Sequence, residues 1–303
     1  MAETIAVHPT AVIGKDVVLG PGTTVGPYAV IEDGVVLGRD NKVWAQAYIA
    51  SGTTLGDRNQ VHPGAILGHL PQDVSFKPET PTFTRIGDDN VFREHCQVHR
   101  ATKPGQATTI GNGCLLMALT HVAHDCAVGN NVILVNQASL PGHCSVGDRV
   151  IMSGFTGIHQ FCRIGRLAFV SALSVSNKDL PPFFIFGGRP ALAESVNVVG
   201  LRRSGVSRET RDELRRAYKL LYRSGLPIKE ALDRIEAECR SPEAAELVAF
   251  CRASKRGIAV SAASATDTLS ERRWRRGARL RAHGAAEPLA DEAGEEEDGG
   301  APP

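Results

Sequence analysis

One periodicity dominates this sequence, because an aliphatic residue recurs at every sixth position over most of the first 170 residues. The first run begins at Ile13 and continues in steps of six to Leu67. After an interruption the series resumes at Ile86, and it ends at Val170. Glycine often follows the aliphatic residue directly, at Gly14, Gly20, Gly26, Gly38, Gly56 and Gly68.

A repeat of six residues predicts a mainly β fold, a parallel β-helix. Each repeat forms one short strand and one tight turn, with the aliphatic residue pointing inward and glycine or asparagine at the positive-φ corner. Three such faces make a coil of 18 residues, and successive coils stack about 4.8 Å apart like parallel strands. A single coil cannot bury its interior, so stacking supplies the hydrophobic core.

Two places depart from this regularity. The spacing from Leu67 to Ile86 is 19 residues, so residues 68–85 are expected to contain an excursion from the stack. Residues 100–106 keep the phase of the repeat, but their Thr-Lys-Pro-Gly sequence predicts a projecting loop. Loops that leave a regular scaffold tend to carry function, so both are candidates for the functional region.

The composition excludes several classes of protein. A formal net charge of +1 gives no overall field that would select nucleic acid or a membrane surface as a partner. The N-terminus lacks the features of a signal peptide, and no stretch approaches the ~18 apolar residues of a membrane span. We therefore expect a cytoplasmic protein with reduced cysteines. Five cysteines fall four residues after an aliphatic repeat position and are expected to be packing residues, not ligands: Cys96, Cys114, Cys126, Cys144 and Cys162.

A helical region should follow the repeats. Ser207 can cap a helix that carries apolar residues at i, i+3, i+4 and i+7, a second helix is expected near residues 228–239, and Ser241 can cap a third. We divide the chain into a β-helix domain at residues 1–190, an α-helical domain at 191–258 and a low-complexity tail at 259–303.

The tail contains a run of arginines followed by a run of acidic residues. Such a composition predicts a disordered, solvated segment. A second interpretation is that the basic segment around Trp274 contacts an acidic partner or a membrane surface.

The repeat also predicts which histidines meet. Val122, Leu140 and Ile158 are 18 residues apart and should stack on one face of three consecutive coils. Two columns follow, His124, Gly142 and Gln160 in one and Asp125, His143 and Phe161 in the next, flanked by His121 and His159. An imidazole suits removal of a proton from a hydroxyl near neutral pH, and a backbone N–H can stabilise an oxyanion. This patch fits direct acyl transfer from a thioester to a hydroxyl, with no serine or cysteine nucleophile.

The motifs at residues 121–126 (His-Val-Ala-His-Asp-Cys), 142–143 (Gly-His) and 158–162 (Ile-His-Gln-Phe-Cys) carry a resemblance. With the segment from residue 7 to 256, they resemble the UDP-N-acetylglucosamine acyltransferases that begin lipid A synthesis. The resemblance implies a left-handed β-helix and a homotrimer with active sites between subunits. It also implies transfer of an (R)-3-hydroxyacyl group from acyl carrier protein to the 3-hydroxyl of UDP-N-acetylglucosamine, without a metal or another cofactor.

Residue roles follow from the resemblance by position. His124 would be the general base, Asp125 its orienting carboxylate and the Gly142 N–H the oxyanion donor. Because neighbours in a strand point to opposite faces, the pairing of His124 with Asp125 requires a bend at the coil corner. The implied substrate-binding residues are Asp73, His121, His143 and His159 around the sugar and pyrophosphate, and Gln160, Asn197 and Arg203 at the nucleotide.

Three further positions bear on specificity. Ala172 matches the position that acts as the acyl-chain ruler in this family, where glycine admits a longer chain and a bulky residue a shorter one, so we expect a medium-to-long chain. Ser75 stands where the family often has lysine, although Lys77 is close by. Val199 stands where a glutamate near the nucleotide is common.

Three alternatives remain open from the sequence. The acceptor could be a 3-amino UDP-sugar, which would give an amide. A metalloenzyme is a second class, since the γ-type carbonic anhydrases use the same solenoid with three histidines on zinc; their paired ligands lie five residues apart, whereas His121 and His124 lie three apart. The third is a non-catalytic scaffold, against which the histidine patch argues.

Overall fold

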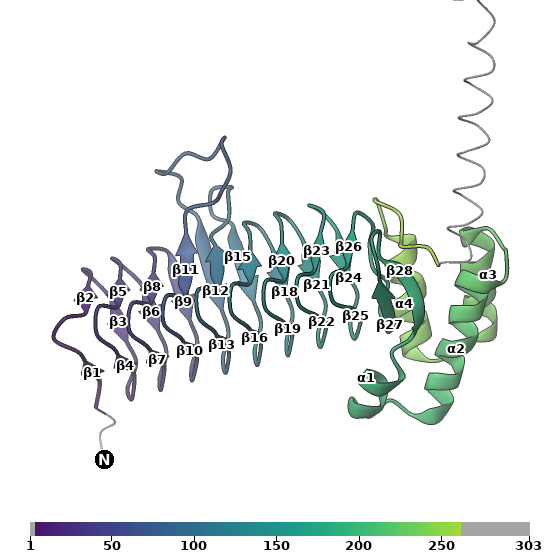
Figure 1. The fold of residues 1–303 in the computed structure, drawn as a ribbon, viewed down its shortest axis with the longest axis horizontal. Helices are drawn as coiled ribbons and strands as arrows, with labels where there is room; N and C mark the ends of the chain where they lie inside the picture. Colours follow the sequence, from purple (N-terminus) through teal and green to yellow (C-terminus); the bar gives the residue numbers. More distant parts are fainter. Residues whose placement is uncertain (1–3, 262–303) are drawn as a thin grey trace, which may run out of the picture. The chain divides into compact units, whose positions relative to one another are not determined.

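The structure, a computed structural model, describes residues 4–261, which form a left-handed parallel β-helix followed by helices (Figure 1). The predicted β-helix is therefore confirmed. Most of the predicted tail, from residue 262 onward, lies outside the described residues. The proposed division into three domains stays a prediction.

Three sheets form the faces of the β-helix, parallel except for the terminal pair β27–β28, and we call them A, B and C. Sheet A contains β1 (Ala6–Val7), β4 (Thr24–Val25), β7 (Lys42–Val43), β10 (Gln60–Val61), β13 (Val91–Phe92), β16 (Leu115–Leu116), β19 (Ile133–Leu134), β22 (Ile151–Met152), β25 (Phe169–Val170), β27 (Phe184–Gly187) and β28 (Leu192–Val196). Sheet B contains β2 (Val12–Ile13), β5 (Val30–Ile31), β8 (Tyr48–Ile49), β11 (Ile66–His69), β14 (Gln97–His99), β17 (His121–Val122), β20 (Ser139–Leu140), β23 (Gly157–Ile158) and β26 (Val175–Ser176). Sheet C contains β3 (Val18–Leu19), β6 (Val36–Leu37), β9 (Thr53–Leu55), β12 (Phe83–Ile86), β15 (Ala107–Ile110), β18 (Ala127–Val128), β21 (Ser145–Val146) and β24 (Arg163–Ile164).

The repeating aliphatic residues fill the interior. Leu116 pairs with Leu134 and Leu134 with Met152, so equivalent positions of successive coils lie one above the other. All three side chains are fully buried. The cysteines of the repeat are buried in the same core and unpaired, as predicted from their spacing.

The glycines that follow the aliphatic residues have a different purpose from the one we expected. With the exception of Gly68, those glycines do not have positive φ; the positive-φ corner falls two residues later, as at Gly22 and Asp40. Gly20 is needed for space, because a Cβ atom there would lie 2.4 Å from the carbonyl carbon of Gly38 in the next coil. The expectation that these glycines supply the positive-φ corner is wrong. They are required because the next coil lies too close to leave room for a side chain.

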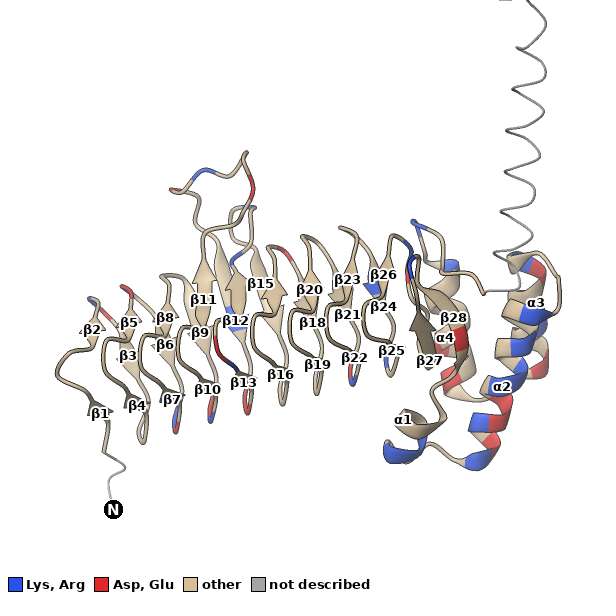
Figure 2. Cartoon of the chain, in the orientation of Figure 1, with Lys and Arg blue, Asp and Glu red and all other residues tan. Residues whose placement is uncertain are grey.

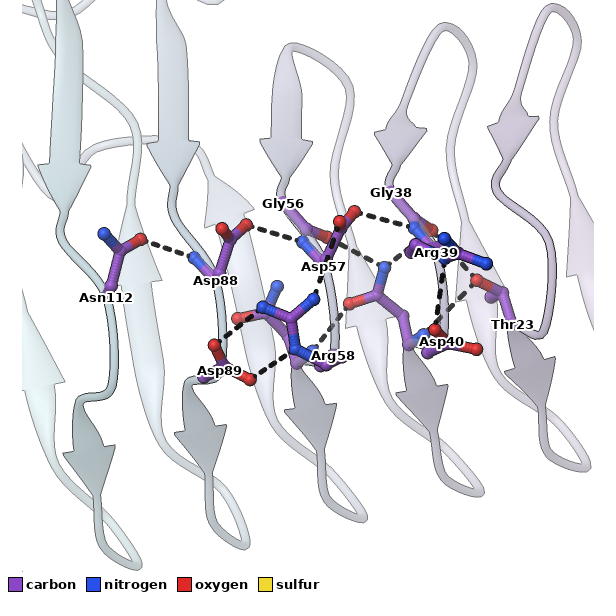
Figure 3. A network of polar contacts seen from close by, with 12 residues as sticks. Thr23, Gly38, Arg39, Asp40, Gly56, Asp57, Arg58, Asp88, Asp89 and Asn112 are labelled. Carbon is purple, nitrogen blue, oxygen red and sulfur yellow. Dashed lines mark hydrogen bonds and ion pairs between the residues drawn. The ribbon is translucent and has the colours of Figure 1, made fainter.

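A polar ladder joins the coils at the corner between sheets C and A (Figure 3). The side-chain oxygen of Asp57 accepts a hydrogen bond from Arg39 N at 2.9 Å, and Asp88 accepts one from Asp57 N at 2.8 Å. Asn112 in turn accepts from Asp88 N at 2.7 Å. Each side chain thus satisfies a backbone donor of the preceding coil, which fixes the register of the stack.

A second row, of buried asparagines, runs beside this ladder and supplies a test of it. Asn59 Oδ1 accepts hydrogen bonds from both Asn90 N and Asn90 Nδ2 at 3.0 Å. We expect Asn59→Ala to lower the free energy of unfolding by about 2 kcal/mol, because it leaves buried donors of Asn90 without a partner. Urea denaturation would measure the loss. Asn177→Ala at an exposed position is the control, and equal stability of the two variants would contradict the interpretation.

Four helices follow the β-helix within residues 4–261: α1 (Val198–Arg203), α2 (Arg208–Arg223), α3 (Ile228–Glu238) and α4 (Pro242–Arg252). The last three were predicted, and Ser207 caps α2 by accepting a hydrogen bond from Thr210 N. The short α1 and the antiparallel pair β27–β28 were not predicted. Charged residues are frequent on these helices and on the corners and loops of the β-helix (Figure 2). No helix in this part of the chain has the length and apolar character needed to span a bilayer.

Both predicted loops leave the stack at the corner between sheets B and C (Figure 1). The first, residues 70–82, joins β11 to β12, and the second, residues 100–106, joins β14 to β15. They therefore come from the same corner of consecutive coils. The return of the chain after residue 252 completes the fold, since Ala259 and Ser261 are buried and Ser261 pairs with Ala193.

Candidate active site

The corner between sheets B and C carries the candidate site. In the coil after the two loops, this corner joins β17 to β18 and contains His124 and Asp125. Three successive coils thus contribute residues 70–82, residues 100–106 and the His124–Asp125 pair at one edge of the β-helix. This adjacency explains how residues far apart in sequence can share one site.

His124 and Asp125 are in direct contact. His124 Nδ1 lies 2.8 Å from Asp125 Oδ2, and the imidazole is 6% exposed. Asp125 has a φ of 58°, which places it in the left-handed region and turns the chain sharply. The bend that this pairing requires is therefore present, and it brings the side chains of two adjacent residues to the same side.

The loop at residues 100–106 holds the Asp125 carboxylate. Thr102 donates its hydroxyl to Asp125 Oδ2 at 2.7 Å and its N–H to Oδ1 at 3.1 Å. Thr108 Oγ1 accepts the Asp125 N–H at 2.8 Å. Burial alone would raise the pKa of Asp125, but the hydrogen bonds from Thr102 and His124 outweigh it, so the pKa is lowered and the group is ionised at neutral pH.

Gly142 packs against the imidazole of His124. A Cβ atom at Gly142 would lie 2.4 Å from His124 Cε1 and 2.6 Å from Nε2, so only glycine fits here without moving the ring. Within residues 4–261 the N–H of Gly142 donates a hydrogen bond to no acceptor. Gly142, which carries this free N–H, therefore lies against the Cε1–Nε2 edge of His124.

The other predicted histidines lie around this pair. His143 packs edge-on against His124, with ring centroids 5.2 Å apart, and stacks on Phe161 at 4.6 Å. Its Nε2 is 3.7 Å from Asp125 Oδ2. His159 and Gln160 are exposed on the next coil. A pocket of about 570 Å³ opens at this edge, lined by Lys103, Pro104, Gln106, Ala107, Asp125 and His143.

Asp73 lies in the first loop. The N–H and the hydroxyl of Ser75 each donate to Asp73 Oδ1 at 2.8 Å. These hydrogen bonds outweigh the effect of burial and lower the pKa of Asp73, so the aspartate is ionised at neutral pH. Ser75 thus engages the carboxylate directly.

His99 lies in β14, which pairs with the strand β17 that carries His121. It was not identified from the sequence. It is 5% exposed, and its ring centroid lies 5.1 Å from that of His121. Within residues 4–261 its buried Nδ1 has no hydrogen-bond partner. Burial first, and then the charge of His121, lowers the pKa of His99 to about 4.

The pKa of His99 predicts an acid-sensitive fold. Its folded-state pKa is about 4, below the value of about 6.5 in an unfolded chain, so the unfolded state binds more protons between these pH values. Stability should therefore fall as the pH drops, by about 2 kcal/mol between pH 7 and pH 5. Urea denaturation of His99→Phe should show that much less loss over this interval, whereas His95→Phe at an exposed position should behave like wild type. Equal pH slopes for all three proteins would contradict the prediction.

His124, Asp125 and His143 also offer three possible metal ligands within 4.8 Å of one another. Ligands of tetrahedral zinc, with bonds near 2.0–2.1 Å, lie roughly 3.3 Å apart. The 2.8 Å between His124 Nδ1 and Asp125 Oδ2 is shorter and corresponds to a direct hydrogen bond. The geometry favours acid–base chemistry at this pair over metal coordination.

Comparison with known proteins identifies the family. Residues 179–259 match the model described as UDP N-acetylglucosamine O-acyltransferase, domain 2, and residues 107–142 match the bacterial transferase hexapeptide model. The acyl-acyl-carrier-protein–UDP-N-acetylglucosamine O-acyltransferase of Sulfurihydrogenibium sp. is 50% identical over 260 residues, covering 85% of this chain and 96% of the relative. This chain belongs to the UDP-N-acetylglucosamine O-acyltransferase family.

Solved structures of UDP-N-acetylglucosamine O-acyltransferases agree. The enzyme of Francisella novicida is 30% identical with a TM-score of 0.82, and the match covers 86% of this chain and 96% of that one. The enzyme of Campylobacter jejuni is 35% identical with a TM-score of 0.79, covering 84% and 99%.

Three residues implied by likeness to the UDP-N-acetylglucosamine O-acyltransferases do not join the His124 site within one chain. Asn197 and Arg203 line a separate pocket of about 450 Å³ over sheet A, together with the half-exposed Val199. Asn197 caps α1 by accepting from Gly200 N and donates to Leu167 O, so its side chain is engaged. Ala172 is exposed at the corner that joins sheet A to sheet B, where β25 leads to β26.

Sequence reasoning also missed Thr102. Its loop interrupts the repeat, so the register could not show that it returns to Asp125. The only signal in the sequence was the loop itself, which was expected to carry function without a named residue.

Proposed function

We propose that this chain transfers an (R)-3-hydroxyacyl group from acyl carrier protein to the 3-hydroxyl of UDP-N-acetylglucosamine, the first step of lipid A biosynthesis. The name of the Sulfurihydrogenibium relative contains both substrates, and the solved relatives are named as UDP-N-acetylglucosamine acyltransferases. The pairing of His124 with Asp125, beside the free N–H of Gly142, supports this chemistry most directly.

His124 acts as the general base in this proposal. Its Nδ1–H donates to the ionised Asp125, which leaves the lone pair on Nε2. Nε2 takes the proton of the acceptor hydroxyl as that oxygen attacks the thioester carbonyl carbon. Asp125 stabilises the imidazolium that forms, as the carboxylate of a catalytic triad does.

Gly142 stabilises the charge that develops on the carbonyl oxygen. Formation of the new C–O bond moves an electron pair onto that oxygen, and the Gly142 N–H can donate to it without breaking another hydrogen bond. The intermediate then collapses with cleavage of the C–S bond. The imidazolium returns its proton to the departing sulfur, which restores neutral His124.

Asp73, His121, His143 and His159 are proposed to bind the sugar and pyrophosphate around this pair, and Gln160 is proposed to bind the nucleotide. Asn197 and Arg203 are proposed to reach the nucleotide from another subunit. Their position over sheet A, away from the corner with His124, supports a homotrimer in which each site draws on two copies. Light scattering of the purified protein tests the trimer.

A cytoplasmic location is part of the proposal. All seven cysteines are free and buried, as expected for a reducing compartment.

The reaction itself is tested with purified protein, a series of 3-hydroxyacyl carrier proteins and two acceptors, UDP-N-acetylglucosamine and its 3-amino analogue. The proposal expects an ester product with the first acceptor and a preferred chain length that shifts upward in Ala172→Gly. Amide formation with the amino sugar alone would replace the acceptor but keep the chemistry. No product from either acceptor would contradict the proposed function.

A further inference from the structure

We propose that Thr102 is a positioning residue for the acyl transfer, acting through Asp125 on His124. The inference rests on the proposed function, because it concerns the rate of that reaction. Thr102 donates two hydrogen bonds to one carboxylate, 2.7 Å from Oγ1 to Oδ2 and 3.1 Å from N to Oδ1.

The hydroxyl of Thr102 and the imidazole of His124 converge on the same oxygen. Oδ2 of Asp125 accepts from Thr102 Oγ1 and lies 2.8 Å from His124 Nδ1. A carboxylate on a short side chain can rotate about its terminal bond, since this torsion has broad minima. Donors on both oxygens remove that freedom and hold Oδ2 toward the imidazole.

The loop that carries Thr102 is fixed at both ends. Arg100 N donates to His69 O at 3.1 Å, and Ala101, which is fully buried, donates its N–H to Phe83 O at 3.2 Å. At the other end Gly105 N donates to Pro81 O at 2.9 Å. Thr102 is therefore placed by backbone contacts that do not involve the substrate.

The Arg100 side chain joins this loop to the first one. Its Nη2 donates to Pro78 O at 3.2 Å, and its guanidinium lies 5.8 Å from the centre of the Phe76 ring. Residues 70–82, which carry Asp73, and residues 100–106, which carry Thr102, thus form one unit over the His124 corner. The unit supplies both a proposed substrate contact and the support of the catalytic carboxylate.

Thr102→Val tests the inference, since valine keeps the shape and the backbone N–H but removes the hydroxyl. We expect kcat to fall about tenfold, with less than a twofold change in KM for the sugar nucleotide. The variant loses a hydrogen bond to the charged Asp125, and Asp125 acts on the reaction through His124 and does not bind the substrate. Thr102→Ser should restore most of kcat. Thr109→Val is the matched control, because Thr109 is an exposed threonine of β15, the strand that follows the loop, and its replacement should leave kcat unchanged.

A double-mutant cycle separates positioning from a general structural role. If Thr102 acts through Asp125, Thr102→Val should have little further effect in an Asp125→Ala background. An equal loss in both backgrounds, or an unchanged kcat in an active wild-type background, would overturn the inference and leave the proposed function intact. An inactive wild type would contradict the proposed function instead. Should Thr102→Val fail to fold, Thr102→Ala carries the same expectations.

Discussion

Replacing His124 with alanine is expected to lower kcat by about 10³-fold, within the range by which a general base accelerates a reaction. The loss should fall mainly on kcat, because the imidazole is 6% exposed and faces Asp125 and Gly142, with little surface left for binding substrate. Steady-state rates of acyl transfer with a saturating donor would measure it.

His95→Ala is the control for this experiment, since His95 is an exposed histidine at a different corner. Its activity should match wild type. If His124→Ala kept more than about a tenth of wild-type kcat, a loss far smaller than expected for a general base, another group would have to take the proton, and His143 would be examined first.

Gly142→Ala is expected to lower kcat by about 100-fold while the protein stays folded. Gly142 does not have positive φ, so alanine is compatible with its backbone. The added Cβ would lie 2.4 Å from His124 Cε1, about 1 Å closer than van der Waals contact permits, and must push the imidazole aside. Misplacing a catalytic group by about 1 Å can cost about 10²-fold in rate.

The next coil along the chain offers a matched control for this substitution. Gly157 lies in β23 of sheet B, also without positive φ, and a Cβ there would meet no atom within 4 Å. Gly157→Ala should therefore be active and folded. Full activity of Gly142→Ala would show that neither the position of His124 nor the space beside it limits the reaction.

The sequence predicted the β-helix because its period is set by a physical requirement that repeats with every coil. Every sixth residue must fill the interior, so Val122, Leu140 and Ile158 could be stacked by counting alone. The columns that contain His124 and Gly142 followed from the same count, and the structure places these two in contact. Positions that depend on the register of the repeat, such as those of His124 and Gly142, could therefore be predicted from the sequence.

Positions that depend on the path of a loop outside the repeat could not be predicted from the sequence. Thr102 reaches Asp125 only because its loop folds back over the corner, and nothing in the repeat specifies that direction. The glycines after the aliphatic residues were predicted to adopt positive φ, but most are required for space. The distance between two stacked coils cannot be derived from the sequence of one coil. Asn197 and Arg203 lie over another face, so the resemblance, and not the fold of one chain, associates them with the site.

Both loops connect sheet B to sheet C, so variation in loop sequence and length can be confined to one edge of this β-helix. Strand β11 pairs with β14 and strand β12 pairs with β15, and these pairings do not involve residues of the two loops. Lengthening a flexible part of a loop costs little free energy, about 0.6 kcal/mol for each doubling of its length. Insertions and deletions in residues 70–82 and 100–106 that leave Asp73 and Thr102 in place would therefore alter the acceptor preference, while the stack that holds His124 keeps its register. The same edge is the natural place to graft new loops when the specificity of the scaffold is redesigned.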